Sequence, residues 1–269
     1  MAVQLEYVNR PKFLSVLFDS LIMIKRSSTH IIRNTDQLLG TFFQPIMFLV
    51  LFTAVFGGAV GMSLPNGVSY INFLMAGIIL QTVAFGSTTT AIAVCNDLQK
   101  GIIDRFRSSP MSSIAVLNGH VVSDVFRNGI SSAVMIIAGL AFGFRSSASF
   151  FEWLAIAGII ILFTLAFSWL SAIIGVLAKS VEGVQWLSFV LVFPLTFASS
   201  AFVPADSMTA WLRGFAENQP ITVVIEAIRA LMIGTPIGSY GWRAVAWSLG
   251  IMIVSIPLAA YLFRRKTTN

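Results

Sequence analysis

The chain has 269 residues, of which 57% are hydrophobic and only 10% are charged. Because a soluble domain carries about 25% charged residues, this composition argues against a water-soluble globular protein. The 17 basic and 11 acidic residues all lie outside six charge-free windows, which are Thr41–Val60, Val68–Cys95, Asn128–Phe144, Trp153–Ala178, Gly183–Ala205 and Ala244–Phe263. A helix needs about 20 residues to cross a hydrocarbon core of roughly 30 Å. We therefore predict an all-α polytopic membrane protein with six transmembrane helices, the third of which extends back through Val121 and Val122.

The Lys and Arg residues are distributed unevenly around these windows. If the N-terminus is inside, 13 of them lie in the cytosol, and four lie outside: Arg145, Arg213, Arg229 and Arg243. Because basic residues concentrate in cytosolic loops, we expect a multi-pass protein of the bacterial cell (inner) membrane with both termini in the cytosol. The net charge of +6 then reflects membrane sidedness and does not indicate a nucleic-acid partner. The first twelve residues have no apolar core, so we expect no cleavable signal sequence.

The segment before the first window is amphipathic. Leu17 and Phe18 lie on one helical face, whereas Lys12 and Asp19 lie on the other. This pattern is typical of a helix in the plane of the membrane interface, and it predicts such a helix over residues 13–33, in contact with lipid. The helix would serve either as a plain surface anchor or as a lever that leads into the first span.

A second amphipathic segment, residues 96–110, follows the second window. Its charged residues recur at helical spacing: Asp97, Lys100, Asp104 and Arg107. Pro110 ends the predicted helix. A short helix at the cytosolic surface between two spans either docks a soluble partner or is simply solvated, which is the usual fate of a charged face. The next cytosolic loop, Lys179–Glu182, is very short, and Glu182 either makes a second contact with that partner or caps the helix that follows.

The segment between the fifth and sixth windows predicts two short helices. Apolar residues recur at helical spacing over residues 208–215 and 221–232, with a break at Asn218-Gln219-Pro220. The two helices, within residues 206–234, either lie flat on the outer leaflet or re-enter the membrane as a hairpin. Glu226 and Arg229 are three residues apart and can pair on the second helix.

Catalytic and metal-binding motifs are absent from the sequence. Gly175–Ser180 lacks the glycines that a P-loop requires, and His30 and His120 are too far apart for an HExxH metal motif. We therefore expect no ATPase site, no metal site and no cofactor bound by this chain. His120, Asp124 and Arg127 share one face at the start of the third span, either as a local ion-pair stripe or as part of an inner gate.

The six windows contain no ionisable residue, and this disfavours ion- or proton-coupled transport. An apolar pathway instead suits a hydrophobic or amphipathic substrate. An intramembrane enzyme that acts on lipids would need clustered catalytic groups at membrane depth, and the windows supply none.

Two motifs resemble those of a known family. The run Lys100–Met111 looks like the cytosolic loop of ABC-2 type permeases, in particular those of daunorubicin/doxorubicin-resistance exporters, with matches at Gly101, Asp104 and Ser109-Pro110. The run Asn218-Gln219-Pro220-Ile221, followed by Glu226, Arg229, Ala230 and Leu231, is similar to a motif before the last span of the same family. The resemblance covers essentially the whole chain as one ABC-2 transmembrane domain, residues 1–269.

The resemblance implies a permease subunit of an ATP-driven exporter that moves a drug or antibiotic out of the cell. It implies a second permease subunit, the same or a paralogue, and two cytosolic ATPase subunits that bind ATP and Mg. Segment 96–110 would be the coupling helix and segment 13–33 the connecting helix. The implied ATPase-coupling residues are Asp97, Lys100, Gly101, Asp104, Arg105, Phe106, Arg107, Pro110 and Glu182. The implied residues of the outer hairpin or gate are Asn218, Pro220, Glu226 and Arg229. The alternative within the same family is an exporter of a lipid-linked glycan.

Overall fold

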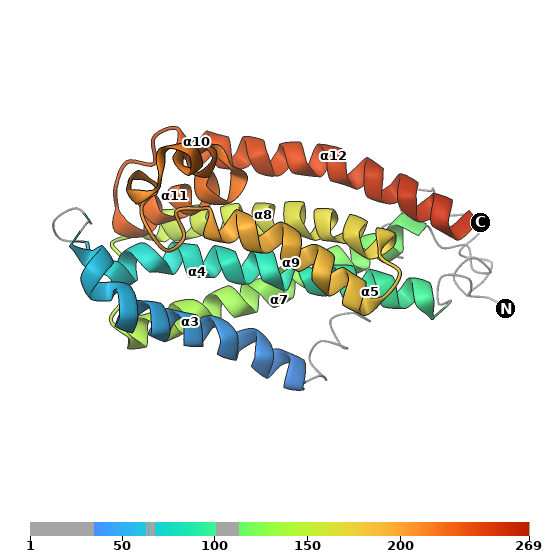
Figure 1. Cartoon of the computed structure of the whole chain (residues 1–269), viewed down its shortest axis with the longest axis horizontal. Helices are drawn as coiled ribbons and strands as arrows, with labels where there is room; N and C mark the ends of the chain where they lie inside the picture. Colours follow the sequence, from blue (N-terminus) through green and yellow to red (C-terminus); the bar gives the residue numbers. More distant parts are fainter. Residues whose placement is uncertain (1–34, 63, 65–67, 101–112, 269) are drawn as a thin grey trace.

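The computed structural model describes residues 35–62, 64, 68–100 and 113–268, and every regular element in these ranges is helical (Figure 1). The elements are α3 (Thr35–Gly61), α4 (Tyr70–Gly86), α5 (Thr88–Gln99), α7 (Ser113–Ala141), α8 (Phe150–Leu177), α9 (Val181–Phe197), the 3-10 turn η1 (Ala205–Ser207), α10 (Ala210–Asn218), α11 (Pro220–Ile233) and α12 (Tyr240–Thr268). The predicted all-α class is confirmed for these ranges. The predicted interface helix, residues 13–33, lies outside the described residues.

Five segments in the described ranges are long and apolar enough to cross a membrane: Phe43–Gly61, Tyr70–Gln99, Val116–Ala141, Phe150–Leu177 and Tyr240–Lys266. The second of them consists of α4 and α5, which are interrupted at Ser87. The fifth predicted span corresponds to α9, an apolar helix of only 17 residues. The structure thus supports a multi-pass membrane protein, with five helices of full spanning length.

The third span requires a correction. The sequence predicts that it extends back through Val121 and Val122, but α7 begins earlier, at Ser113, and its apolar segment begins at Val116. His120, Asp124 and Arg127 therefore lie within a helix that can span the membrane. The charge-free window therefore leaves out charged residues that this helix carries, because a charge that is paired inside a bundle does not have to end the helix.

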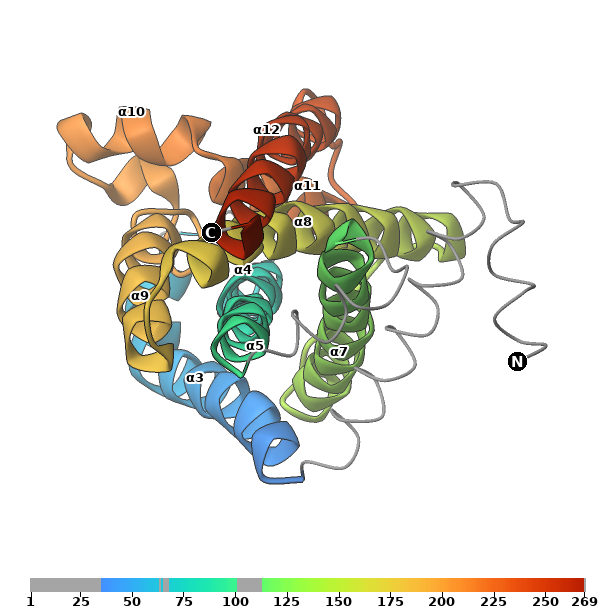
Figure 2. The ribbon, with the colours of Figure 1, turned by 90° about the vertical axis from the view of Figure 1, so that its right-hand side faces the viewer.

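The long helices run roughly side by side, and α4 lies at the centre of the bundle (Figures 1 and 2). Every residue of α4 from Phe73 to Ala84 is buried, as expected for a helix that is apolar all round. α10 and α11 lie together at one end, which we call the hairpin end. The last turns of α5 and α12 and the start of α9 lie toward the other end, which we call the C-terminal end. α3 and α12 leave most of their apolar surface uncovered.

Two glycines allow backbones to approach closely. A Cβ atom on Gly77 of α4 would collide with the backbone of Ala201, in the segment that follows α9. A Cβ atom on Gly175 of α8 would collide with the backbone of Ala91 in α5. Small residues at such crossings let helices pack at van der Waals distance in lipid, where no hydrophobic force holds them together.

Candidate functional site

Arg229 of α11 joins three parts of the hairpin end. Its buried guanidinium donates from Nε to the carbonyl of Phe73 in α4, at 3.0 Å, and from Nη2 to the carbonyl of Ser200 after α9. It also pairs with Glu226, one turn earlier on α11. Bonds to two carbonyls and a carboxylate satisfy a charge that would otherwise be costly to bury. Burial lowers the pKa of Arg229, and the charge of Glu226 opposes this shift.

Gln219, at the start of α11, caps the end of α9. Its side-chain amide donates to the carbonyls of Leu195, at 2.7 Å, and Ala198, at 3.0 Å. The last carbonyls of a helix lack partners within that helix, so these bonds complete the end of α9. Thr222 adds a third link, because its hydroxyl accepts a bond from the Ser200 amide at 3.2 Å. The hairpin therefore fixes the position at which α9 ends.

Asn218, Pro220 and Arg213 also lie at the hairpin end. The Asn218 amide donates to Gly214 at 3.0 Å, and its oxygen accepts a bond from Arg243 of α12 at 2.8 Å. Pro220 occupies the first turn of α11, where a missing N–H costs nothing. On the exposed face of α10, the hydrogen bond to Glu217 and the charge of Asp206 raise the pKa of Arg213.

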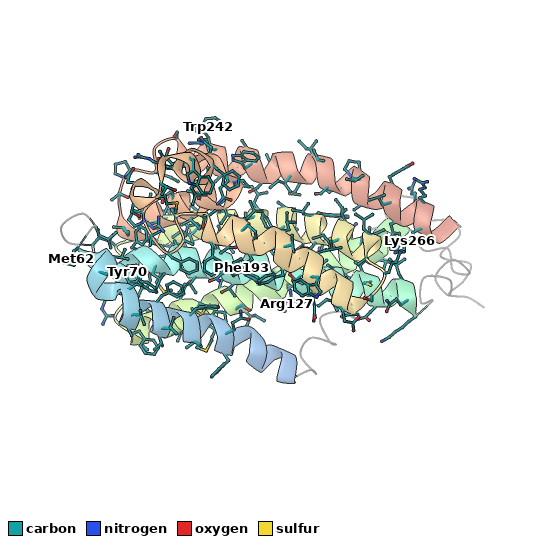
Figure 3. All side chains as sticks on the ribbon, in the orientation of Figure 1. Met62, Tyr70, Arg127, Phe193, Trp242 and Lys266 are labelled. Carbon is teal, nitrogen blue, oxygen red and sulfur yellow. The ribbon has the colours of Figure 1, made fainter. Side chains whose placement is uncertain are left out.

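A second polar cluster lies within the length of the bundle, and Figure 3 labels Arg127 there, well away from Lys266 at the C-terminal end. Arg127 pairs with Asp124 one turn earlier on α7, and both side chains are almost fully buried. Asp124 also accepts a bond from the Ser168 hydroxyl on α8, and Arg127 donates to the Gly86 carbonyl at the end of α4. One ion pair thus links three helices.

The C-terminal end holds three further contacts between helices. Asp97 of α5 bonds to His120 of α7 at 2.9 Å. The Gln99 amide donates to the Lys179 carbonyl at 2.8 Å, which links the last turn of α5 to the loop between α8 and α9. The Lys266 ammonium donates to the carbonyls of Val176, at 2.6 Å, and Ala178, at 3.1 Å, and so caps α8.

The comparison with known families decides what kind of protein carries this arrangement. The family model described as ABC-2 type transporter matches residues 20–233. The chain belongs to the ABC-2 type transporter family. The resemblance inferred from the two sequence motifs is therefore confirmed.

Relatives of this ABC-2 chain match over most of its length. It is 31% identical to the "Daunorubicin resistance ABC transporter permease protein DrrB1" of Streptomyces coeruleorubidus, over 87% of this chain and 81% of the relative. It is 26% identical to the "Probable doxorubicin resistance ABC transporter permease protein DrrC" of Mycobacterium tuberculosis (strain ATCC 25618 / H37Rv), over 93% of this chain and 90% of the relative. Nodulation protein J of Rhizobium meliloti is 25% identical over 86% of each chain.

The predicted coupling residues of this ABC-2 chain are only partly described. Six of them lie outside the described residues, so their role stays a prediction: Gly101, Asp104, Arg105, Phe106, Arg107 and Pro110. Residues 96–99 form the last turn of α5 instead of the start of a separate helix. Asp97 is predicted on a polar face that either docks a partner or is solvated, but its side chain is buried and bonds to His120 of α7. Lys100 is exposed directly after α5.

Glu182 is exposed in the first turn of α9. Bonds from its own backbone N–H and from Ser180 lower the pKa of the carboxyl group, as expected for a group at a helix start. The hydroxyl of Ser180 accepts a bond from the Gly183 amide at 3.1 Å and is the N-cap. This geometry is consistent with the capping alternative, and a contact between Glu182 and a partner stays a prediction.

The hairpin prediction is accurate in outline. Two short helices are present, separated at Gln219, and Glu226 pairs with Arg229 as expected. Re-entry into the membrane stays a prediction. Of the two alternatives for the His120, Asp124 and Arg127 stripe, ion pairs that face protein are what the structure contains, although His120 pairs with Asp97.

Sequence reasoning missed several residues that complete these clusters. The sequence places Gln219 in a helix break and in a family motif but does not predict its bonds to α9, and it does not single out Ser168 or Gly86. A usable signal existed, because a polar side chain in an apolar run is expensive in lipid and generally has a partner. The identity of each partner depends on contacts between distant segments, which spacing along the chain does not reveal.

Proposed function

We propose that this chain is the transmembrane half of an ATP-driven exporter for a hydrophobic or amphipathic small molecule such as an antibiotic. The observation that carries the proposal is its similarity, over nearly its full length, to permeases named for daunorubicin and doxorubicin resistance. A separate cytosolic subunit binds ATP and Mg and hydrolyses the nucleotide. Two permease chains and two ATPase chains form the working assembly.

The proposed orientation puts the C-terminal end in the cytosol and the hairpin end outside, with α9 as a sixth crossing. The distribution of charge supports this orientation, since Lys179, Arg265 and Lys266 lie at or near the C-terminal end. In this arrangement α5 runs directly into the segment that we assign to the ATPase contact. The bonds of Arg229 and Gln219 would hold the outer mouth closed in the resting state.

The proposed substrate is apolar because the uncovered surfaces are apolar. α9 presents Trp186, Phe189 and Phe193 on an exposed face, and the row of ring contacts continues through Phe197 to Phe202. Aromatic surfaces of this kind suit planar hydrophobic compounds and lipid alike. The alternative substrate, a lipid-linked glycan, is not favoured by the two relatives that are named for drug resistance.

The test is to purify the chain with its candidate ATPase, reconstitute the complex in lipid, and measure ATP hydrolysis with and without daunorubicin. We expect the drug to stimulate hydrolysis and to accumulate inside inside-out vesicles when ATP is present. Drug-independent hydrolysis combined with no uptake would rule out the proposed substrate class. If Asp104→Asn and Arg107→Gln leave both assembly and stimulated hydrolysis intact, the assignment of the coupling segment is wrong.

A further inference from the structure

The second span is broken in its middle. The amide of Thr90 donates to the carbonyl of Ser87 at 3.1 Å, one residue short of the α-helical partner, Gly86. The Gly86 carbonyl instead accepts bonds from the Thr89 hydroxyl, at 2.9 Å, and from the guanidinium of Arg127. A break at membrane depth is tolerated only when side chains satisfy the freed backbone groups. Arg127 is therefore the partner that α7 supplies to the break.

The break lies on a boundary between separate hydrophobic cores. The core at the hairpin end includes α4 up to Ala84 and α8 up to Phe167. The cores at the C-terminal end begin with Ala91 of α5 and Trp169 of α8. Between them lies a polar layer, which consists of Gly86, Asp124, Arg127, Asn128 and Ser168. The α4–α5 span, α7 and α8 all pass from one core to the other through this layer.

The two halves of the broken span differ in their main neighbours, although both contact α7, α8 and α9. α4 packs mainly against α3, α11 and α7, whereas α5 packs mainly against α8 and α9. The backbone of α5 meets Gly175 of α8, and Gln99 bonds to the Lys179 carbonyl. α5 is thus fastened to the part of the bundle near the C-terminal end, and α4 to the part near the hairpin end.

The polar layer and the helix turns next to it also contain hydrogen-bonding atoms without a partner. Both amide atoms of Asn128, Nε of Arg127 and the hydroxyls of Thr90 and Ser132 are buried without a hydrogen-bond partner in the described part of the chain. Buried polar groups in native proteins are nearly always satisfied, so unused atoms call for an explanation. A second arrangement of the same helices, in which these atoms are bonded, supplies one. An interlocked apolar core offers no comparable alternative positions.

We infer that the polar layer is a joint, with Arg127 as its latch, about which α5 and its neighbours tilt against α4 and the hairpin end. The Asp124 carboxylate and the Ser168 hydroxyl hold the Arg127 guanidinium against the Gly86 carbonyl in the arrangement described here. The use of this joint as the lever that carries motion from the ATPase rests on the proposed function. The joint itself is a property of this chain alone.

Spin-label distances in the permease, reconstituted in lipid nanodiscs, test the joint. Cys95 is the only cysteine and is replaced by Ser in all samples. One label pair spans the joint, at Phe43→Cys of α3 and Lys100→Cys after α5, and both positions are exposed. A reference pair lies on one side of it, at Lys100→Cys and Leu177→Cys. With Arg127 intact we expect one narrow distance distribution for each pair.

The test variants weaken the latch to different degrees. Arg127→Gln removes the cation. Arg127→Lys keeps the charge but loses the planar, forked geometry of the guanidinium, and it serves as the test if Arg127→Gln does not fold. Ser168→Ala removes one bond to Asp124. Thr164→Val is its matched control, because Thr164 is buried one turn away on α8 but bonds to Ile160 of its own helix.

The Arg127 and Ser168 variants should broaden and shift the 43–100 distance and leave the 100–177 distance unchanged, whereas Thr164→Val should leave both unchanged. The inference is overturned if the latch variants leave the 43–100 distance unchanged, and also if they broaden both distances. Nucleotide added to the complex with the ATPase should shift only the 43–100 distance. If the variants act as expected but nucleotide does not shift this distance, the joint stands and its use as a lever is wrong.

Discussion

Arg229 lies over the ring of Phe73, with its guanidinium carbon 3.7 Å from the ring centroid, and it also donates to the carbonyl of that same residue. One side chain of α11 thus contacts α4 through both the π-face and the backbone. A guanidinium suits this position because it is planar, carries five donors and is less strongly hydrated than an ammonium group.

Replacement of Arg229 should therefore destabilise the hairpin end. We expect Arg229→Gln to cost about 3 kcal/mol, because Glu226 and the Ser200 carbonyl lose a buried partner together. Arg229→Lys should fall between the wild type and Arg229→Gln, since an ammonium cannot reach both carbonyls and the ring. The measurement is the thermal unfolding midpoint of the chain in lipid.

Arg213→Gln is the control for this change. Arg213 also pairs with two acidic residues, Asp206 and Glu217, but it lies on the exposed face of α10. An exposed ion pair contributes little, so its loss should not shift the midpoint measurably. Equal shifts for Arg213→Gln and Arg229→Gln would contradict the role assigned to the buried contacts.

Gln219→Met tests the cap on α9. The replacement keeps the length of the side chain but leaves the Leu195 and Ala198 carbonyls without their donor. Loss of a partner at a buried carbonyl costs about 1–3 kcal/mol, so we expect a lower unfolding midpoint. Hydrogen exchange should also become faster at the end of α9. The same change at Gln185, which is exposed near the start of α9, should alter neither measurement.

Glu226 and Arg229 show how far the sequence could predict the site. The Glu226–Arg229 pair follows from local spacing, and the structure contains it. The contacts of Arg229 with Phe73 and Ser200 join positions 156 and 29 residues apart, and no helical period relates them. The same limit applies to the third span, where the bond from Ser168 to Asp124 joins positions 44 residues apart.

Lys266→Met tests the bonds by which Lys266 caps the end of α8. Without the ammonium group, the Val176 and Ala178 carbonyls lose their donor, and the positive charge near the negative end of the helix dipole disappears. We expect faster hydrogen exchange over the last turn of α8 and a small decrease in the unfolding midpoint. Arg265→Met removes the neighbouring charge in the same turn of α12 and should leave the exchange of α8 unchanged. Equal effects of the two variants would mean that charge alone, and not the cap, acts there.

Gly175→Ala tests the backbone contact between α8 and α5. The added methyl group would meet the carbonyl oxygen and Cα of Ala91, which are backbone atoms and cannot rotate away. Overpacking of this kind costs about 1–3 kcal/mol, although alanine is otherwise the better helix former. Gly158→Ala in the same helix is the matched control, because its added methyl group meets no atom within 4 Å. We expect the unfolding midpoint to fall for Gly175→Ala and to stay equal or rise slightly for Gly158→Ala. A Gly175→Ala protein as stable as the control would show that α5 and α8 are not in backbone contact. The rigid attachment of α5 to α8, on which the proposed joint depends, would then also be wrong.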